Sequence, residues 1–191
     1  TEVHEPGLNP TSGRFMGFVP GGGLFASSLG DYLAAVGNRY AGVCFPSPGA
    51  VKLENRLIRW MARLVGYHPE SAGGTLCSGG SVASLTAVVA ARDHAGMKPE
   101  EFHRSVVYLT EQAHHCIRKA LHIAGLGGSP VRMVAMDRGF RMDPDDLARL
   151  IAMDRGAGLN PFMIVASAGT TDAGAIDPLS RIAEVAESER I

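Results

Sequence analysis

The sequence predicts an α/β fold, a three-layer arrangement in which a mostly parallel sheet carries helices on both faces. Three observations lead to this class. In the second half of the chain, short apolar runs alternate with longer segments whose apolar residues recur at helical spacing. The short runs over residues 106–110 and 162–167 are apolar almost throughout, as in strands that are buried on both faces. Each such run is followed by a helical segment, which is the connection that parallel strands require.

Residues 1–48 differ from the rest because glycine and proline punctuate them. Loop signals stand at residues 20–23 and 45–49. Between these loops we expect one helix over residues 24–36. We therefore predict an N-terminal arm over residues 1–48 and a separate, incomplete large domain over residues 49–191.

The elements of residues 49–191 follow from hydrophobic spacing and from capping residues. Asp143 precedes Pro144, which is the cap-then-proline order that opens a helix. The expected elements are, in order, helices over 50–65 and 81–95, a strand over 106–110, a helix over 114–124 ended by Gly125, a strand over 131–135, a helix over 143–153, a strand over 162–167 and a helix over 178–190.

The glycine-rich turn over residues 73–81 leads directly into a helix and is therefore a candidate phosphate site. Gly80 stands where a nucleoside-triphosphate loop would hold lysine, and the dinucleotide fingerprint is not met. A single small phosphate, seated by Gly79, Gly80 and the Ser81 hydroxyl, is the better fit. The alternative is an ordinary tight turn with Ser81 as the helix N-cap.

Two further polar loops follow predicted strands, at residues 111–115 and 169–172. Carboxyl ends of parallel strands meet at one edge of the sheet, where such folds bind ligands. His114 could serve there as an acid or base, as a metal ligand or as a flat ring that stacks on a planar cofactor. No feature of the sequence suggests such a role for His115, and we expect its side chain to be exposed or structural.

Composition excludes several classes of function. With 18 basic and 19 acidic residues the net charge is −1, so neither nucleic acid nor a membrane is expected as a partner. Cys44, Cys77 and Cys116 are odd in number and widely spaced, which favours a reducing, cytoplasmic location. No metal site is expected, because no cluster of histidine and cysteine completes a ligand set. No nucleophile elbow of a serine hydrolase is present.

Several motifs, in order, give the chain a resemblance to a known family. They cover residues 14–21, 47–54, 78–81, 112–114 and 168–171. Together they resemble the group II pyridoxal-phosphate-dependent amino acid decarboxylases, the family of aromatic-L-amino-acid and glutamate decarboxylases. The resemblance covers nearly the whole chain. It implies the fold of the fold-type I pyridoxal-phosphate (PLP)-dependent transferases and a partial PLP-binding large domain over residues 49–191.

The resemblance also implies roles for particular residues. Gly80 and Ser81 would hold the phosphate of pyridoxal 5′-phosphate. His114 would stack on its pyridine ring and assist proton transfer, and Thr171 would lie near the ring. The segment that contains Phe18, Pro20 and Gly21 resembles the family's substrate-pocket loop.

The function implied is decarboxylation of an L-amino acid to the amine and CO2, in a homodimer. The segment over residues 47–54 favours the aromatic branch of the family. One alternative is another fold-type I enzyme, a lyase or an aminotransferase. The other is a non-catalytic, truncated remnant that binds a phosphate ligand or a partner subunit.

Two of the family's residues are expected beyond Ile191, which makes the chain an expected N-terminal piece of a longer domain. These are the aspartate that pairs with the ring nitrogen and the lysine that forms a Schiff base with the cofactor. Lys119 and Asp177 are not assigned to these roles. Lys119 lies within an expected helix rather than after a strand.

Overall fold

The computed structural model describes residues 7–17 and 21–191 of the chain. The chain divides into two compact units, Thr1–Leu76 and Cys77–Ile191. This division falls after the domain boundary predicted between residues 48 and 49, which stays a prediction. In order, the helices and strands are α1 (Phe25–Gly37), α2 (Pro48–Leu64), α3 (Gly80–His94), the 3₁₀ helix η1 (Pro99–Arg104), β1 (Ser105–Leu109), α4 (Cys116–Leu121), the π-helical turn η2 (His122–Leu126), β2 (Val131–Met133), α5 (Pro144–Gly156), β3 (Asn160–Ile164) and α6 (Leu179–Glu189).

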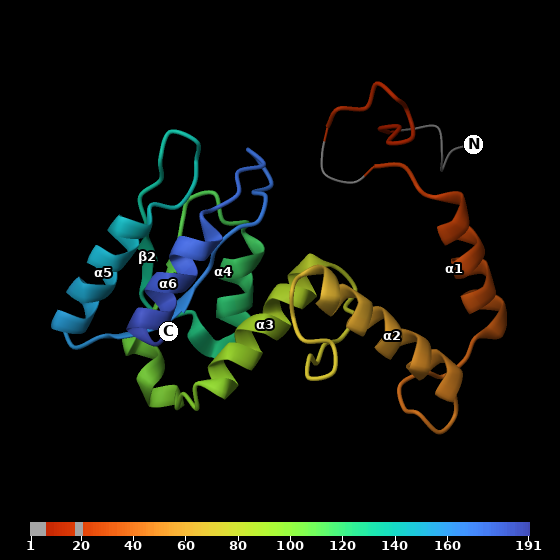
Figure 1. Ribbon diagram of the computed structural model, residues 1–191, viewed down its shortest axis with the longest axis horizontal. Helices are drawn as coiled ribbons and strands as arrows, with labels where there is room; N and C mark the ends of the chain where they lie inside the picture. The colour runs from red at the N-terminus through yellow and green to blue at the C-terminus, as the bar shows by residue number, and fades with distance from the viewer. Residues whose placement is uncertain (1–6, 18–20) are drawn as a thin grey trace. The chain divides into compact units, whose positions relative to one another are not determined.

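The second unit is built on a three-stranded parallel sheet in the order β2-β1-β3. Helices α3 and α4 pack against the face that carries Val107 and Leu109, whereas α5 and α6 pack against the face of Val106 and Tyr108 (Figure 1). All five residues of β1 are buried, as a strand covered on both faces requires. The predicted three-layer α/β fold is therefore confirmed.

Helices α3 and α4 run side by side in the same direction. Near their beginnings, Ser84 Oγ lies 3.4 Å from Cys116 Sγ. Eight residues further along each segment, Arg92 Nη1 of α3 donates to the carbonyl oxygen of Ala124 in η2, the continuation of α4, at 2.7 Å. Because α4 begins just after the carboxyl end of β1, both helices begin at the carboxyl edge of the sheet.

Local sequence accounts for the start of α5 but not for the end of α4. The Asp143 carboxylate accepts hydrogen bonds from the backbone N–H groups of Asp145 and Asp146, so the predicted cap of α5 is confirmed. The helix expected over residues 114–124 is shorter than predicted. Regular α4 is limited to Cys116–Leu121 and continues as η2, where Gly125 adopts φ 84°.

A buried polar cluster ties two strands of the sheet to helix α5 on one face. The Tyr108 hydroxyl in β1 donates to Asp154 Oδ2 of α5 at 2.9 Å. Arg132 of β2 donates to both carboxylate oxygens of the same aspartate. Burial and the bond to Asp154 raise the pKa of Tyr108 well above its usual range. The Tyr108 hydroxyl and both Asp154 oxygens are engaged within the fold, so we assign this cluster to stability rather than to catalysis.

The first unit contains α1 and α2. No residue of α1 is buried, and of α2 only Ala62 is buried. In the described part of the chain, none of the helices is both long enough and apolar enough to span a bilayer.

Candidate functional site

The start of α3 offers unused hydrogen-bond donors. Gly79 adopts φ 97°, a conformation that side-chain-bearing residues rarely take, and its carbonyl oxygen accepts the first helical bond, from Ala83. The N–H groups of Gly80, Ser81 and Val82 have no acceptor among the described residues. These donors point out of the helix N-terminus, where the dipole also favours negative charge.

The N-cap of α3 is Gly79, and no side chain of the described residues caps the helix. The alternative in which Ser81 is the N-cap of an ordinary turn is therefore wrong. Ser81 is the second residue of the helix, is exposed, and its hydroxyl has no partner within the described residues. A Cβ at Gly80 would meet no atom within 4 Å, so open space lies beside the free N–H groups. The N–H of Gly79 donates to the carbonyl oxygen of Cys77 at 2.9 Å, so this N–H, unlike those of Gly80, Ser81 and Val82, is already engaged.

His114 lies in the loop between β1 and α4, at the carboxyl edge of the sheet. The loop turns sharply, because Ala113 N donates to the carbonyl oxygen of Thr110 at 3.1 Å. The backbone N–H of Cys116 donates to His114 Nδ1 at 3.2 Å. This bond makes Nδ1 an acceptor in the neutral ring and leaves Nε2 to carry the proton. The exposed His115 packs its ring 4.0 Å from that of His114.

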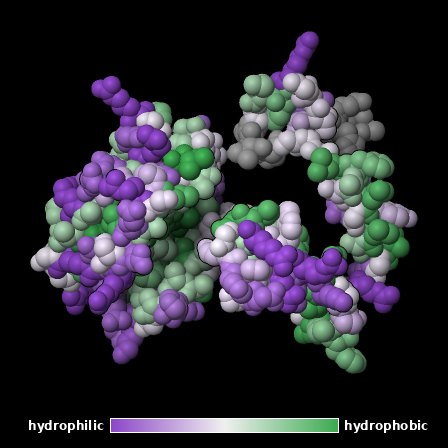
Figure 2. All heavy atoms as spheres, in the orientation of Figure 1, coloured by the Kyte–Doolittle hydropathy of each residue, from purple (hydrophilic) through white to green (hydrophobic). Residues whose placement is uncertain are grey.

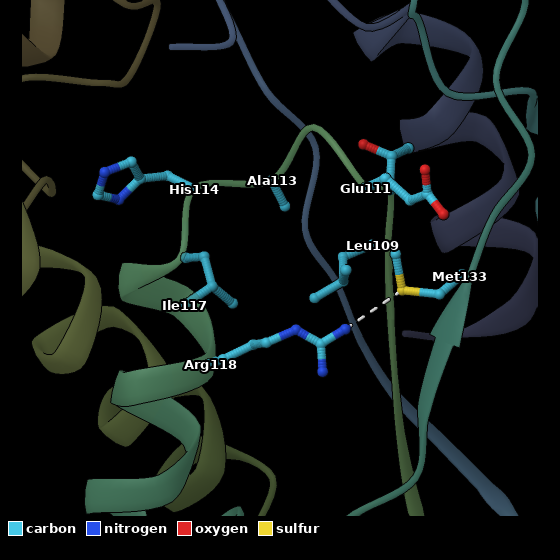
Figure 3. A pocket seen from close by; sticks show the side chains of 8 residues that line it. Leu109, Glu111, Ala113, His114, Ile117, Arg118 and Met133 are labelled. Atoms are coloured by element: carbon cyan, nitrogen blue, oxygen red, sulfur yellow. Dashed lines mark hydrogen bonds between the residues drawn. The ribbon is translucent and has the colours of Figure 1, made fainter. Parts of the chain in front are cut away.

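A cavity of about 290 Å³ lies beside the His114 loop. Arg118 reaches across it and donates from Nη2 to Met133 Sδ at 3.4 Å (Figure 3). A thioether is a weak acceptor, so the guanidinium keeps most of its hydrogen-bonding capacity. In Figure 3 the imidazole of His114 is turned away from Arg118. The residues that line the cavity are Leu109, Thr110, Glu111, Ala113, His114, Ile117, Arg118 and Met133.

Thr171 lies at the tip of a hairpin that follows β3. Within it, Thr170 N donates to the carbonyl oxygen of Ala175 at 2.9 Å, and Ala175 N donates back to Thr170 Oγ1 at 3.1 Å. Gly174 N donates to the carbonyl oxygen of Thr170 at 2.8 Å. The hairpin is thus closed by its own backbone, and Thr171 is exposed on it.

The structure brings four of the predicted site residues to one edge of one unit. Gly80 and Ser81 begin α3, His114 precedes α4 and Thr171 follows β3, all at the carboxyl edge of the sheet. Their roles stay predictions.

The substrate-loop residues belong to the other unit. Phe18 and Pro20 lie outside the described residues. Gly21 is exposed, and a Cβ added to it would meet no atom within 4 Å. The fold of the described residues therefore tolerates a larger side chain at this position.

Sequence reasoning missed two features of this edge. Arg118 of α4 lines the same cavity as His114, but His114 precedes the helix, so no helical spacing in the sequence links the two residues. Gln112 was seen only as part of a motif. Its Oε1 atom is buried with no hydrogen-bond partner in the described structure, an arrangement that proteins usually avoid.

The free donors at the start of α3 and the open space beside Gly80 fit a phosphate group. A flat, exposed imidazole at the same edge fits an aromatic ring. Within the described part of the chain, no three His, Cys, Asp or Glu side chains gather as a metal ion would require.

Comparison with known proteins gives a consistent result. A family model described as the pyridoxal-dependent decarboxylase conserved domain matches residues 6–191. The aromatic-L-amino-acid decarboxylase of Bacillus atrophaeus is 32% identical over 178 residues, which cover 93% of this chain and 36% of that protein. The cysteine sulfinic acid decarboxylase of Homo sapiens is 34% identical over 148 residues, or 74% of this chain and 29% of that protein.

A solved structure shares the fold. The tryptophan decarboxylase of Catharanthus roseus, determined in complex with L-tryptophan, superposes with a TM-score of 0.88 at 26% identity. The superposition covers 96% of this chain and 40% of that chain. The chain thus spans well under half the length of the relatives that it matches.

Proposed function

The chain belongs to the pyridoxal-dependent decarboxylase family, and from this premise we propose that the protein decarboxylates an L-amino acid with pyridoxal 5′-phosphate as cofactor. The observation that carries the proposal is the start of α3. Three backbone N–H groups and the Ser81 hydroxyl have no partner there among the described residues, and they lie beside the space that a Cβ at Gly80 would enter. Such a set of donors suits the dianionic phosphate of this cofactor.

Gly80 and Ser81 hold the phosphate in this proposal, and Thr171 lies beside the ring. The cofactor, when bound, supplies an electron sink for the pair of electrons released when the bond between Cα and the carboxylate breaks. The protein contributes orientation and the exclusion of water.

In this proposal His114 stacks on the cofactor ring and assists proton transfer. Its Nδ1 accepts the N–H of Cys116, which fixes the ring's orientation and leaves the Nε2–H of the neutral ring to donate a hydrogen bond. The start of α4 thus holds the imidazole from one side, and its opposite edge stays free.

An aromatic amino acid is the substrate that we favour. The names of the Bacillus atrophaeus and Catharanthus roseus relatives support an aromatic substrate, whereas the human relative is named for cysteine sulfinic acid. We place Phe18, Pro20 and Gly21 in the substrate pocket. Gly21 leaves room there for a bulky side group of the substrate.

We further propose a homodimer in the cytoplasm. On α1 the residues Phe25, Leu29, Tyr32, Leu33 and Val36 are each at least 50% exposed, and Figure 2 shows hydrophobic side chains along this helix. An apolar face of this size favours an extensive protein interface, and a second copy of the chain is the occupant that we propose. Three free cysteines are consistent with a reducing compartment.

The decisive experiment supplies the purified protein with pyridoxal phosphate and with carboxyl-labelled L-amino acids, one at a time. We expect labelled CO2 and the matching amine, with aromatic substrates turned over faster than glutamate or cysteine sulfinate. Sedimentation of the same sample tests the dimer.

The other outcomes separate the alternatives. Formation of a 2-oxo acid without CO2 release identifies an aminotransferase, and elimination of a side-chain group identifies a different lyase. If the protein does not bind pyridoxal phosphate at all, the remaining alternative is a non-catalytic remnant.

A further inference from the structure

A buried carboxylate closes the base of the hairpin that carries Thr171. Asp177 is 3% exposed, and its Oδ2 accepts the backbone N–H of Ser167 at 2.7 Å. The N–H of Asp177 donates in turn to the carbonyl oxygen of Ser167 at 2.9 Å. Side chain and backbone of one residue therefore fasten both ends of the hairpin to each other.

The other oxygen of the same carboxylate reaches a different loop. Asp177 Oδ1 accepts the N–H of Met142 at 2.7 Å. Met142 is buried in the core under α5 and α6, and it pairs with Met136 across the loop that follows β2. The hairpin after β3 is thereby fastened to the hydrophobic core rather than only to itself.

We propose that Asp177 is a positioning residue for the cofactor site, acting through the hairpin that presents Thr171. The proposal rests on the proposed function, since it assumes that Thr171 meets the cofactor. Both Asp177 oxygens accept backbone N–H groups and the residue is only 3% exposed, so the carboxylate is buried within the fold and is not open to the cofactor's ring nitrogen. Its influence on the site is therefore geometric.

The geometry predicts a specific asymmetry between two aspartates. Asp177 uses a different oxygen for each of its two N–H donors. Asp143 also accepts two backbone N–H groups, from Asp145 and Asp146, but both reach the same oxygen, Oδ1. An asparagine keeps one carbonyl oxygen and replaces the other with an NH2 donor. Asp143→Asn can therefore keep both bonds, whereas Asp177→Asn must lose one.

The test compares these two variants, which remove the same charge. The first readout is amide hydrogen exchange without cofactor, at Ser167, Met142 and the hairpin between residues 167 and 177. The second is the dissociation constant for pyridoxal phosphate. We expect Asp177→Asn to speed amide exchange across the hairpin and to weaken cofactor binding roughly tenfold or more. Contacts between the hairpin and the cofactor contribute much less to binding when they are displaced from their best geometry. Asp143→Asn leaves both quantities unchanged.

A double-mutant cycle with Thr171→Ala then tests the route of the effect. If Asp177 acts through Thr171, the loss of affinity caused by Asp177→Asn shrinks when Thr171 is already alanine. Equal losses in both backgrounds, or a loosened hairpin with unchanged affinity, would overturn the inference. If Asp177→Asn does not fold, Thr170→Val replaces it, since it removes only the bond from Ala175 N and is expected to act in the same direction.

Failure of this inference and failure of the proposed function are distinguishable. Wild-type protein that does not bind pyridoxal phosphate refutes the proposed function and, with it, the assumption about Thr171. Normal wild-type binding that Asp177→Asn leaves intact refutes the positioning role alone.

Discussion

Ser81→Ala separates cofactor binding from stability. The Ser81 hydroxyl has no partner among the described residues and does not cap α3, so its removal breaks no bond within the fold. In the proposed complex the same hydroxyl donates to a phosphate oxygen. The substitution should therefore weaken cofactor binding while the free protein keeps its stability.

The size of both effects follows from the position of Ser81. A hydrogen bond to a charged group contributes about 1.5–3 kcal/mol, which corresponds to a roughly 10- to 150-fold rise in the dissociation constant. Alanine is the better helix former at the second position of α3, by up to about 0.5 kcal/mol. The free energy of unfolding of the cofactor-free protein is thus expected to stay constant or rise slightly.

The assay is a titration with pyridoxal phosphate followed by absorbance, together with urea unfolding of the cofactor-free protein. Ser188→Ala is the matched control. Ser188 is exposed on α6, near the end of that helix, and its hydroxyl bonds only to the carbonyl oxygen of Val185. Because α6 begins at the carboxyl edge, its end lies away from the proposed site.

An unchanged dissociation constant for Ser81→Ala would refute the phosphate assignment. A loss of affinity accompanied by an equal loss in Ser188→Ala would point instead to a general effect on the unit. A large drop in the stability of the cofactor-free Ser81→Ala protein would contradict the observation that its hydroxyl is unpartnered.

Three further predictions concern other parts of the molecule. His114→Ala should lower turnover by about 10²–10⁴-fold, as expected for a group that assists proton transfer. The stability of the fold should change little, because the ring is exposed and its only hydrogen bond among the described residues is to the N–H of Cys116. Retained turnover would show that His114 is a structural residue. Replacing Gly21 with a residue that has a larger side chain should change the ranking of amino acid substrates in turnover assays and leave cofactor affinity unchanged, because the space around its Cβ position is open. An effect on cofactor occupancy alone would exclude Gly21 from the substrate pocket. Tyr108→Phe should destabilise the fold by about 1 kcal/mol in urea unfolding, through loss of the bond to Asp154. Because the pKa of Tyr108 is raised in the fold, the unfolded chain loses this proton first as pH rises. The free energy of unfolding of the wild type should therefore fall above about pH 10, and that of Tyr108→Phe should fall less. Identical slopes of stability against pH in the two proteins would contradict the burial of this hydroxyl.

The order of the elements could be predicted from the sequence because it depends on local patterns. The apolar run of β1 and the pairing of Asp143 with Pro144 each act over a few residues, and both predictions are confirmed. The end of regular α4 could not be placed in the same way. Residues up to 124 have a helical pattern, but packing and the positive φ of Gly125 turn the segment into η2.

The candidate site was predictable only as separate loops. Glycines before a helix indicated the phosphate position, and polar residues after strands indicated His114 and Thr171. The roles of Asp177 and Arg118 could not be found in this way, because each depends on a partner from another element. Asp177 bonds to Met142, which is 35 residues away in the sequence, and Arg118 reaches Met133 of β2.

The sequence by itself determined the α/β class, the order of helices and strands and the family, since these follow from hydrophobic spacing and short motifs. The tertiary structure alone decided that α3 and α4 run in parallel from one edge of the sheet. It also decided that Gly79 rather than Ser81 caps α3, and that one buried carboxylate fastens two loops. The physical reason is that hydrophobic periodicity is a local property, whereas the hydrogen-bond partner of a buried polar group is chosen only when distant segments meet.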